Sequence, residues 1–387
     1  MIKHQNWNYP TAIRFGPGRL HELSHTCLEL GIKRPLIVTD PGLAKLPLMK
    51  AAMEACADGG TPANPFHDIQ GNPVGANIDA GIQCYKETDS DGVIALGGGS
   101  ALDAGKAIAF MVGQNRPIWD FEDREDWWTR ANEAGIAPIV AVPTTSGTGS
   151  EVGRAAVITD EQSQTKKIIF HPKMLPSRVL LDPTTTLGMP PSLTAAVGMD
   201  ALSHALEAYC SPVYHPLAHG IAVEAMRLIR SHLVTAFEDG ANLTARAHLQ
   251  VAAMMGATAF QKGLGAMHAM SHPCGAILNT HHGLTNAVVM PYVLEFNRSA
   301  IAVEMAHLAQ ALDLPTPGLD GVIQWVLQLR ETLAIPKTLS EIGVRYEHIE
   351  QLAPMALGDP SGNTNPVSLS LASVRQLFGQ AISGPVS

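Results

Sequence analysis

The sequence predicts an α/β fold in which a domain built on a parallel sheet precedes an all-helical domain. In the first half of the chain, short apolar runs that stop at Gly or Pro alternate with helical stretches. Runs that are apolar on both faces are typical of buried parallel strands, and the repeated order of strand, loop and helix indicates crossover helices. After residue 188 the strand signals fade, and long, largely apolar helical stretches follow.

The strand character is clearest in three runs, residues 36–39 (LIVT), 93–96 (VIAL) and 139–142 (IVAV). Helices are expected between them over 43–57 and 101–112. Ser100 is the predicted N-cap of the second helix, because serine is a favoured cap and Asp103 follows three residues later.

The second half is expected to be helical, with a domain boundary near residue 188. Helical stretches that are apolar nearly all round belong in the core of an all-helical domain. The predicted domains are therefore 1–188, with the sheet, and 189–387, with the helices. The expected helices cover residues 193–210, 216–238, 244–260, 265–278 and 285–297.

Composition narrows the classes of function. The 387 residues are 46% hydrophobic, which excludes a mainly disordered chain. The formal net charge of -9 disfavours binding to nucleic acid or to an anionic membrane, because an acidic chain releases no counterions from a polyanion. The cysteines are odd in number and lack CxxC spacing, so neither a disulfide framework nor a zinc knuckle is expected.

The sequence also predicts a cytoplasmic protein. The first ten residues, MIKHQNWNYP, contain no apolar core of a signal peptide. The longest apolar runs, such as 251–260, span about ten residues, whereas a membrane-spanning helix needs about 20.

A glycine-rich loop follows the predicted strand at 93–96. Residues 97–106 read GGGSALDAGK and lie where a strand hands over to a helix. Glycine there lets backbone N–H groups approach a phosphate closely, and the helix N-terminus adds partial positive charge. The loop matches neither the GxGxxG nor the Walker pattern, so a tight structural turn stays an alternative.

A second loop, 143–151 (PTTSGTGSE), follows the predicted strand at 139–142. Its hydroxyls and glycine amides form a candidate cradle for an anion or a ribose, although a capped turn would use the same residue types. Two such loops after two strands of one sheet favour a shared ligand, so we interpret the first domain as Rossmann-like and dinucleotide-binding.

Asp40 ends the strand at 36–39 and is the candidate residue for choosing between dinucleotides. A carboxylate at this position can accept hydrogen bonds from both ribose hydroxyls of an adenosine and repels a 2′-phosphate, which favours NAD over NADP. The alternative is an ordinary Asx turn formed by Asp40, Pro41 and Gly42.

Carboxylate and imidazole side chains recur at helical spacing in the second half. Asp200 and His204 differ by four positions, and so do His268 and His272, which places each pair on one helix face. Adjacent histidines follow at 281–282. Buried Asp and His side chains need partners, and a divalent cation supplies them. Any one of these residues alone would more often be an ordinary core or surface residue, but the set indicates a metal site.

These stretches resemble the signatures of a known family. Gly198–Glu207 (GMDALSHALE) and Gly265–Gly275 (GAMHAMSHPCG), followed by His282-Gly283, are similar to the metal-binding signatures of the iron-dependent (group III) alcohol dehydrogenases. That family includes lactaldehyde reductase and 1,3-propanediol dehydrogenase, and the resemblance implies a dehydroquinate synthase-like architecture. The other matching stretches are 97–106, 143–151, Asn72-Pro73 and Asn365-Pro366.

The resemblance implies a role for each matching residue. The metal ligands would be Asp200, His204, His268 and His282. His272 would face the nicotinamide as the catalytic residue, either relaying a proton or donating a hydrogen bond that shapes the pocket. The positions that would contact the dinucleotide are Asp40, Asn72, Gly97, Gly98, Gly99, Ser100, Asp103, Thr144, Thr145, Thr148 and Lys166.

Two positions depart from the family pattern. Ser271 replaces the usual alanine before His272, and His281 stands where the family commonly has proline. His281 therefore competes with His282 as the last ligand. We assign His282, because its spacing and the following Gly283 match the signature.

The expected function is that of an oxidoreductase: a metal-dependent, NAD(H)-linked interconversion of a primary alcohol or diol and its aldehyde by hydride transfer. One carboxylate with three imidazoles suits Fe²⁺ or Zn²⁺ better than Mg²⁺, and the resemblance points to iron. The partner would be a small-molecule alcohol or aldehyde, and members of the family are often homodimers or larger homo-oligomers.

Other functions stay open on sequence grounds. A non-redox enzyme like dehydroquinate synthase would need basic residues near the metal, yet the helices around Asp200 and His268 are mostly apolar. A hydroxyacid-oxoacid transhydrogenase would act without added NAD, and a non-catalytic binding protein would have no need of aligned ligands. The charged, aromatic run at 120–130 (DFEDREDWWTR) would be a flap, an oligomer contact or a solvated loop.

Overall fold

The computed structural model describes residues 5–7 and 11–384, so most of the segment considered for a signal peptide lies outside the described residues. The contacts between Cα atoms divide the chain into two compact units. The N-unit comprises Met1–Thr145 and Gly149–Gly188, and the C-unit comprises Ser146–Thr148 and Met189–Ser387. The N-unit has a sheet with covering helices and the C-unit is helical, which confirms the predicted fold class.

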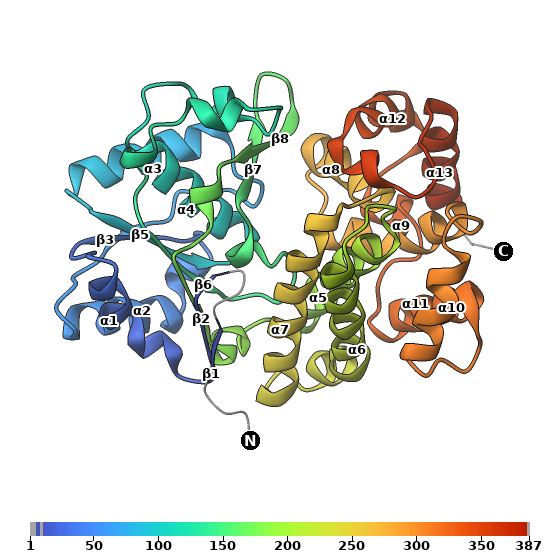
Figure 1. The fold of residues 1–387 in the computed structure, drawn as a ribbon, viewed down its shortest axis with the longest axis horizontal. Helices are drawn as coiled ribbons and strands as arrows, with labels where there is room; N and C mark the ends of the chain where they lie inside the picture. Colours follow the sequence, from blue (N-terminus) through green and yellow to red (C-terminus); the bar gives the residue numbers. More distant parts are fainter. Residues whose placement is uncertain (1–4, 8–10, 385–387) are drawn as a thin grey trace. The chain divides into compact units, whose positions relative to one another are not determined.

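Seven of the described strands of the N-unit form one sheet, part of which is seen in Figure 1, in the order β1-β2-β9-β6-β5-β3-β4. β1 pairs antiparallel with β2, and every other neighbouring pair is parallel. The predicted strands correspond to β3, β5 and β6, which lie next to one another. The strands are β1 (Gln5–Trp7), β2 (Ile13–Phe15), β3 (Pro35–Val38), β4 (Asn64–Phe66), β5 (Gly92–Gly97), β6 (Ile139–Pro143) and β9 (Arg178–Leu181).

Helices cover both faces of this sheet because its buried side chains alternate between them. Leu36 and Val38 belong to the hydrophobic cluster that includes residues of α3 and α4, whereas Ile37 belongs to the cluster with α1 and α2. Each such side chain contributes about 1.5–3 kcal/mol when fully buried. Figure 1 shows α1 and α2 on one side of the strands and α3 and α4 on the other. The helices are α1 (Leu23–Glu29), α2 (Pro47–Asp58), α3 (Gly75–Glu87) and α4 (Gly99–Met111).

A hairpin of β7 (Ala155–Asp160) and β8 (Thr165–Phe170) forms a second sheet that the sequence pattern did not predict. The charged run at 120–130 pairs with it. Glu122 forms an isolated bridge with Ile169, and the Asp123 N–H donates to the Ile168 carbonyl at 2.7 Å. The run is therefore joined to β8 by backbone hydrogen bonds.

Two local predictions for the N-unit were wrong. The helix expected at 43–57 is interrupted, because Pro47 holds Leu46 in an extended conformation and begins α2 as its first residue. Ser100 is not the N-cap of α4: the helix begins at Gly99 with Gly98 as its cap. The Ser100 hydroxyl donates to the Gly71 carbonyl instead.

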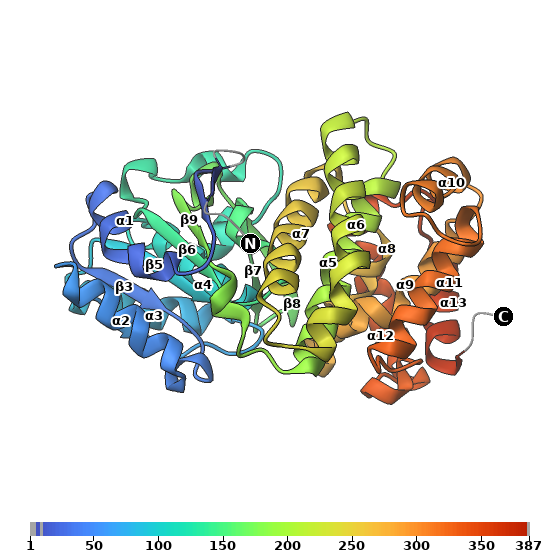
Figure 2. The same ribbon diagram turned by 90° about the horizontal axis from the view of Figure 1, so that it is seen from below.

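The C-unit is an all-helical domain. Figure 2 shows α5, α6 and α7 running side by side, and the five helices expected from the sequence correspond to α5–α9. The helices are α5 (Pro191–Cys210), α6 (Pro216–Glu238), α7 (Leu243–Ala259), α8 (Ala266–Leu278), α9 (His282–Phe296), α10 (Ala302–Ala311), α11 (Gly318–Thr332), α12 (Ile349–Gly358) and α13 (Leu371–Ser383).

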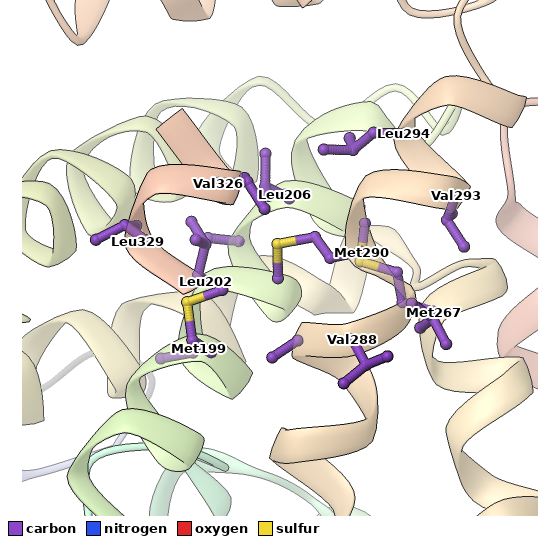
Figure 3. Close-up of a cluster of buried hydrophobic side chains, with 14 of the residues drawn as sticks. Met199, Leu202, Leu206, Met267, Val288, Met290, Val293, Leu294, Val326 and Leu329 are labelled. Carbon is purple, nitrogen blue, oxygen red and sulfur yellow. The ribbon is translucent and has the colours of Figure 1, made fainter. Parts of the chain in front are cut away.

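The core of the C-unit draws on all of its α-helices, and Figure 3 shows the part of it made by aliphatic and methionine side chains of α5, α8, α9 and α11. Leu202 and Leu206 of α5 lie in it one helical turn apart, so the same helix that carries Asp200 and His204 is anchored by apolar packing. The residues labelled in Figure 3 are Met199, Leu202, Leu206, Met267, Val288, Met290, Val293, Leu294, Val326 and Leu329.

Short 3₁₀ helices connect many of these elements. They are η1 (Arg19–Glu22), η2 (Leu43–Lys45), η3 (Ile118–Phe121), η4 (Trp127–Arg130), η5 (Glu133–Gly135), η6 (Ser150–Val152), η7 (Pro172–Met174), η8 (Pro183–Thr186), η9 (Phe260–Lys262), η10 (Ser340–Ile342), η11 (Tyr346–His348) and η12 (Pro360–Thr364). In the part of the chain that the structure describes, every helix is too short or too polar to cross a lipid bilayer.

Candidate functional site

A group of metal-binding side chains converges inside the C-unit. Each of Asp200, His204, His268 and His282 offers a ligand atom, and these atoms lie within 4.8 Å of one another. The first three side chains are buried and His282 is partly buried. Ligand atoms around a tetrahedral ion with bonds of about 2.1 Å lie about 3.4 Å apart, so the four atoms need to move little to share one ion. The donor set fits a divalent transition metal.

His281 lies outside this group. Its side chain is exposed and caps α9, where Nδ1 accepts a hydrogen bond of 3.4 Å from the Leu284 N–H. The sequence analysis assigned His282 rather than its competitor His281, and the structure places His282 together with Asp200, His204 and His268. The predicted start of α9 at residue 285 was three residues late, because the capping residue is His281.

The group is assembled by helix spacing and one close helix contact. Asp200 and His204 lie one turn apart on α5, and His268 and His272 do so on α8. At the start of α9, a Cβ atom on Gly283 would lie 2.4 Å from the Ala196 carbonyl oxygen and 2.9 Å from Asp200 Cβ. Only glycine therefore allows α9 to approach α5 this closely.

Glu207 holds His268 from behind. Its Oε2 lies 2.6 Å from His268 Nδ1, and its Oε1 accepts a hydrogen bond of 2.6 Å from the Met267 N–H. Burial disfavours a charged His268 ring, but the adjacent Glu207 carboxylate raises the pKa of His268 above its usual value. With Nδ1 engaged by the carboxylate, Nε2 of His268 is the nitrogen available to a metal.

Asn286 is a second residue at the group to which sequence reasoning gave no role. Its Nδ2 donates to Asp200 Oδ1 at 2.9 Å and lies 3.2 Å from His282 Nε2. It sits four positions after His282 on α9, the one sequence signal that could have found it. The Asn286 amide therefore orients the Asp200 carboxylate.

His204 is uncharged at neutral pH. Burial lowers the pKa of His204 to about 4 and outweighs the opposing effect of Asp200. A neutral imidazole is the form that binds a metal ion. The protonation state of this side chain thus suits the role that the sequence predicts for it.

His272 lies beside the group without belonging to it. Its ring stacks on His282 with centroids 5.3 Å apart, and its Nδ1 lies 2.8 Å from Asp359 Oδ2. Burial opposes ionisation of Asp359, but His272 and the Ser361 N–H lower the pKa of Asp359 below its usual value. Asp359 therefore carries negative charge at neutral pH.

In the N-unit, the loops after β3, β5 and β6 meet at the carboxyl edge of the sheet. The Thr144 N–H donates to the Gly97 carbonyl at 2.9 Å, and a Cβ atom on Gly98 would lie 3.3 Å from Thr145 Cγ2. Gly97 has a φ of 153°, and a Cβ there would lie 2.6 Å from Ala101 Cβ. The two predicted cradle loops are thus neighbours, as a shared ligand requires.

The remaining predicted nucleotide contacts of the N-unit extend this edge. The Ser100 hydroxyl bonds to the Gly71 carbonyl and so brings the Asn72 turn to the start of α4. Lys166 pairs with Thr159 across the hairpin, and the Thr159 N–H donates to the Pro73 carbonyl at 2.8 Å. Asn72, Ser100 and Lys166 therefore lie on adjoining segments.

Asp40 forms the Asx turn that the sequence offered as its alternative role. Its Oδ1 accepts hydrogen bonds from the Gly42 and Leu43 N–H groups, both at 2.9 Å. Its Oδ2 lies 3.8 Å from the position of a Cβ on Gly97, beside the glycine loop. One carboxylate oxygen therefore shapes the turn, and the other lies at the cradle.

Asp103 and Thr148 are placed differently from the other predicted contacts. The Asp103 carboxylate accepts hydrogen bonds from the Val157 N–H at 2.9 Å and from the Ser150 hydroxyl, and it lies 3.2 Å from Lys106 Nζ. Asp103 thus ties α4 to β7. Thr148 belongs to the short segment that groups with the C-unit.

Comparison with known proteins gives matches along nearly the whole chain. Residues 10–183 match the family described as "Iron-containing alcohol dehydrogenase", and residues 194–382 match "Fe-containing alcohol dehydrogenase family, C-terminal". A 4-hydroxybutyrate dehydrogenase of Cupriavidus necator is 37% identical over 384 residues, which cover 97% of this chain and 99% of that protein.

Solved structures agree with this assignment. One described as 1,3-propanediol oxidoreductase has a TM-score of 0.91 at 32% identity and covers 99% of this chain and 100% of its own. A sulfoacetaldehyde reductase of Bifidobacterium kashiwanohense, solved in complex with NAD+, has a TM-score of 0.88 at 26% identity, and the match covers 100% of each chain. The resemblance seen in the sequence is confirmed, and the chain belongs to the iron-containing alcohol dehydrogenase family.

Proposed function

We propose that this oxidoreductase interconverts a primary alcohol or diol and its aldehyde by hydride transfer to and from NAD. The convergence of Asp200, His204, His268 and His282 within 4.8 Å is the observation that carries the proposal. Related proteins described as 4-hydroxybutyrate dehydrogenase and 1,3-propanediol oxidoreductase support the reaction class.

Asp200, His204, His268 and His282 would hold a divalent ion, which we propose to be Fe²⁺, with Zn²⁺ as the alternative. A bound ion of this kind supplies a Lewis acid for the substrate oxygen, and NAD supplies the hydride acceptor. The reaction requires no covalent bond between the protein and the substrate. The residues of the protein bind the two reactants, exclude water from them and move one proton.

His272 is the proposed proton carrier of the reaction. With Nδ1 held against Asp359, the ring presents Nε2 on its opposite side, where it can take up or return the hydroxyl proton. Glu207 and Asn286 keep His268 and Asp200 oriented through hydrogen bonds of 2.6 and 2.9 Å. These contacts fix the directions of donor atoms before substrate arrives, which lowers the cost of organising the site.

The N-unit residues would bind NAD in preference to NADP. Backbone N–H groups of the glycine loop and the start of α4 suit the pyrophosphate. Asp40 Oδ2 would accept hydrogen bonds from the ribose hydroxyls and would repel a 2′-phosphate. The Thr144 backbone and the Thr145 hydroxyl adjoin the same loop.

We further propose a cytoplasmic homodimer or larger homo-oligomer. The cysteines all lie within the described residues and none is part of a disulfide, which suits a reducing compartment. At the start of α6, Tyr214 is 90% exposed and Leu217 is 68% exposed. Exposed large apolar side chains this close in the sequence offer a candidate surface for a subunit contact.

The proposal is tested by steady-state kinetics on purified protein reconstituted without oxygen with Fe²⁺ or Zn²⁺. A panel of primary alcohols, diols and aldehydes is assayed with NAD and with NADP. We expect NADH to form with an alcohol or diol only when metal is present. Equal turnover by metal-free protein, or no turnover with any member of the panel, would contradict the proposal, and turnover without added NAD would support a transhydrogenase instead.

A further inference from the structure

We propose that Asp359 is a positioning residue that fixes the ring orientation and the tautomer of His272. The proposal rests on the proposed function, in which His272 carries the proton. Asp359 Oδ2 lies 2.8 Å from His272 Nδ1, and the side chains are only 11% and 12% exposed. The pair is therefore largely shielded from water, which would otherwise compete for the same hydrogen bond.

The Asp359 carboxylate is itself held in place. It lies between α12 and η12, and its other oxygen, Oδ1, accepts a hydrogen bond of 2.9 Å from the Ser361 N–H. Asp359 is thus the N-cap of η12 as well as the partner of His272. Each of its oxygens has one task, so the direction of Oδ2 is set by the cap.

This arrangement determines which nitrogen of His272 carries hydrogen. An ionised carboxylate can only accept hydrogen bonds, so Nδ1 must be the donor. The neutral ring then has its lone pair at Nε2. The ring plane is fixed by packing as well, because His272 stacks on His282 at an interplanar angle of 14° and meets His268 edge-on at 70°.

The same device occurs one turn earlier on α8. At His268, Glu207 places one oxygen on the ring Nδ1 and the other on a backbone N–H, that of Met267. At His272, Asp359 does the same with Ser361. The two imidazoles differ in their neighbours: His268 belongs to the metal-binding group, whereas His272 does not. We infer that the paired carboxylates orient one imidazole for the metal and one for the proton.

Substitution of Asp359 by serine separates this role from capping. Serine caps helices as well as aspartate does, but its shorter side chain carries one oxygen and cannot also reach His272. We expect Asp359→Ser to lower kcat on the order of 10- to 100-fold while metal content and the KM for NAD stay within about twofold. If Asp359 only caps η12, Asp359→Ser will match the native enzyme and Asp359→Ala alone will be impaired.

Substitution by asparagine reverses the tautomer. With its oxygen on the Ser361 N–H, the asparagine amide would turn its NH₂ group toward Nδ1 and force the hydrogen onto Nε2. We expect Asp359→Asn to lose at least as much kcat as Asp359→Ser, although asparagine is closer in shape to aspartate. An asparagine variant as active as the native enzyme would overturn the proposal.

The tautomer can be measured without turnover. The measurement is nitrogen-15 NMR of the zinc-loaded holoenzyme labelled at histidine, and the signals of His272 are assigned from their loss in His272→Gln. We expect the Nδ1–H form of His272 in the native chain and the Nε2–H form in Asp359→Asn. An Nε2–H form in the native chain overturns the proposal. An Nδ1–H form in a protein that oxidises no alcohol would refute the proposed function while supporting the role of Asp359.

Discussion

The candidate metal group of the C-unit and the candidate nucleotide cradle of the N-unit are built by different means. The metal group consists of side chains on α5, α8 and α9, held by further side chains such as Glu207. The cradle consists mainly of backbone at the ends of β5 and β6, with small hydroxyl side chains beside it. The metal group therefore depends on a few side chains that single substitutions can remove, whereas the cradle depends mainly on the path of the backbone. Substitutions should therefore affect the two regions separately.

The largest effect is expected from removing a ligand of the metal group. Asp200→Ala or His268→Ala should lose the metal, and kcat/KM should fall on the order of 10³-fold or more, because a Lewis-acid ion contributes several kcal/mol. Binding of NAD, measured by calorimetry, should stay within about twofold. His281→Ala is the matched control, since His281 adjoins the group without joining it. If NAD binding were lost together with the metal, the two regions would not respond independently to substitution.

A buried carboxylate in the N-unit should make stability depend on pH. Burial raises the pKa of Glu151 to about 7 from 4.5. Between these values the folded state binds more protons than the unfolded state, so stability should fall by about 3 kcal/mol as pH rises from 4.5 to 7. Urea unfolding of Glu151→Gln should lack this fall. Glu161→Gln, at an exposed turn, should behave as the native chain, and an unchanged pH slope in Glu151→Gln would exclude burial as the cause.

A smaller effect is expected when the support of a ligand is altered. Glu207→Gln keeps the size of the side chain but replaces the carboxylate that faces His268 Nδ1. We expect the metal dissociation constant to rise about 10- to 100-fold, with kcat of the fully loaded enzyme reduced less. Competition with a chelator measures the affinity. Unchanged affinity would mean that helix packing alone orients His268.

The smallest effect concerns the cradle. Asp40→Asn retains an oxygen for the Gly42 and Leu43 N–H groups but replaces Oδ2 by an amide. Loss of a charged hydrogen-bond acceptor costs about 1.5–3 kcal/mol, so the preference for NAD over NADP, as a ratio of kcat/KM values, should shrink by about tenfold or more. Metal content should not change. A ratio that stays constant would assign Asp40 to the turn alone.

The difference between the regions also explains what the sequence could predict. The i,i+4 spacing pointed to Asp200, His204 and His268, because it places side chains on one helix face whatever the tertiary structure. His282 was added from the family resemblance, and the structure brings all four side chains together. Glu207 and Asn286 were given no role. An acid on an apolar helix does not reveal its partner, and the i,i+4 spacing of Asn286 from His282 was not used. Asp359 acts across 87 positions of sequence, from a turn that ordinary capping already explains.

In the N-unit, the buried strands β3, β5 and β6 were predicted, whereas the buried strand β9 and the short strands β2 and β4 were not. β3, β5 and β6 are continuous apolar runs, whereas β2 and β4 have three residues each and too little pattern to detect. The Ser100 cap was wrong because its hydroxyl bonds to the Gly71 carbonyl, a contact that depends on how distant turns meet. The predicted nucleotide contacts stay predictions, although the structure brings most of them to one edge.

The contact at Gly283 has a consequence for any attempt to alter the metal preference. A side chain there would collide with the Ala196 carbonyl oxygen, so the separation of α5 and α9 is already at its backbone limit. A designer who wants the protein to select another ion can exchange the donor atoms. The two helices, in contrast, cannot be brought closer, so selection of a smaller ion must come from the chemistry of the donor atoms rather than from a tighter cage.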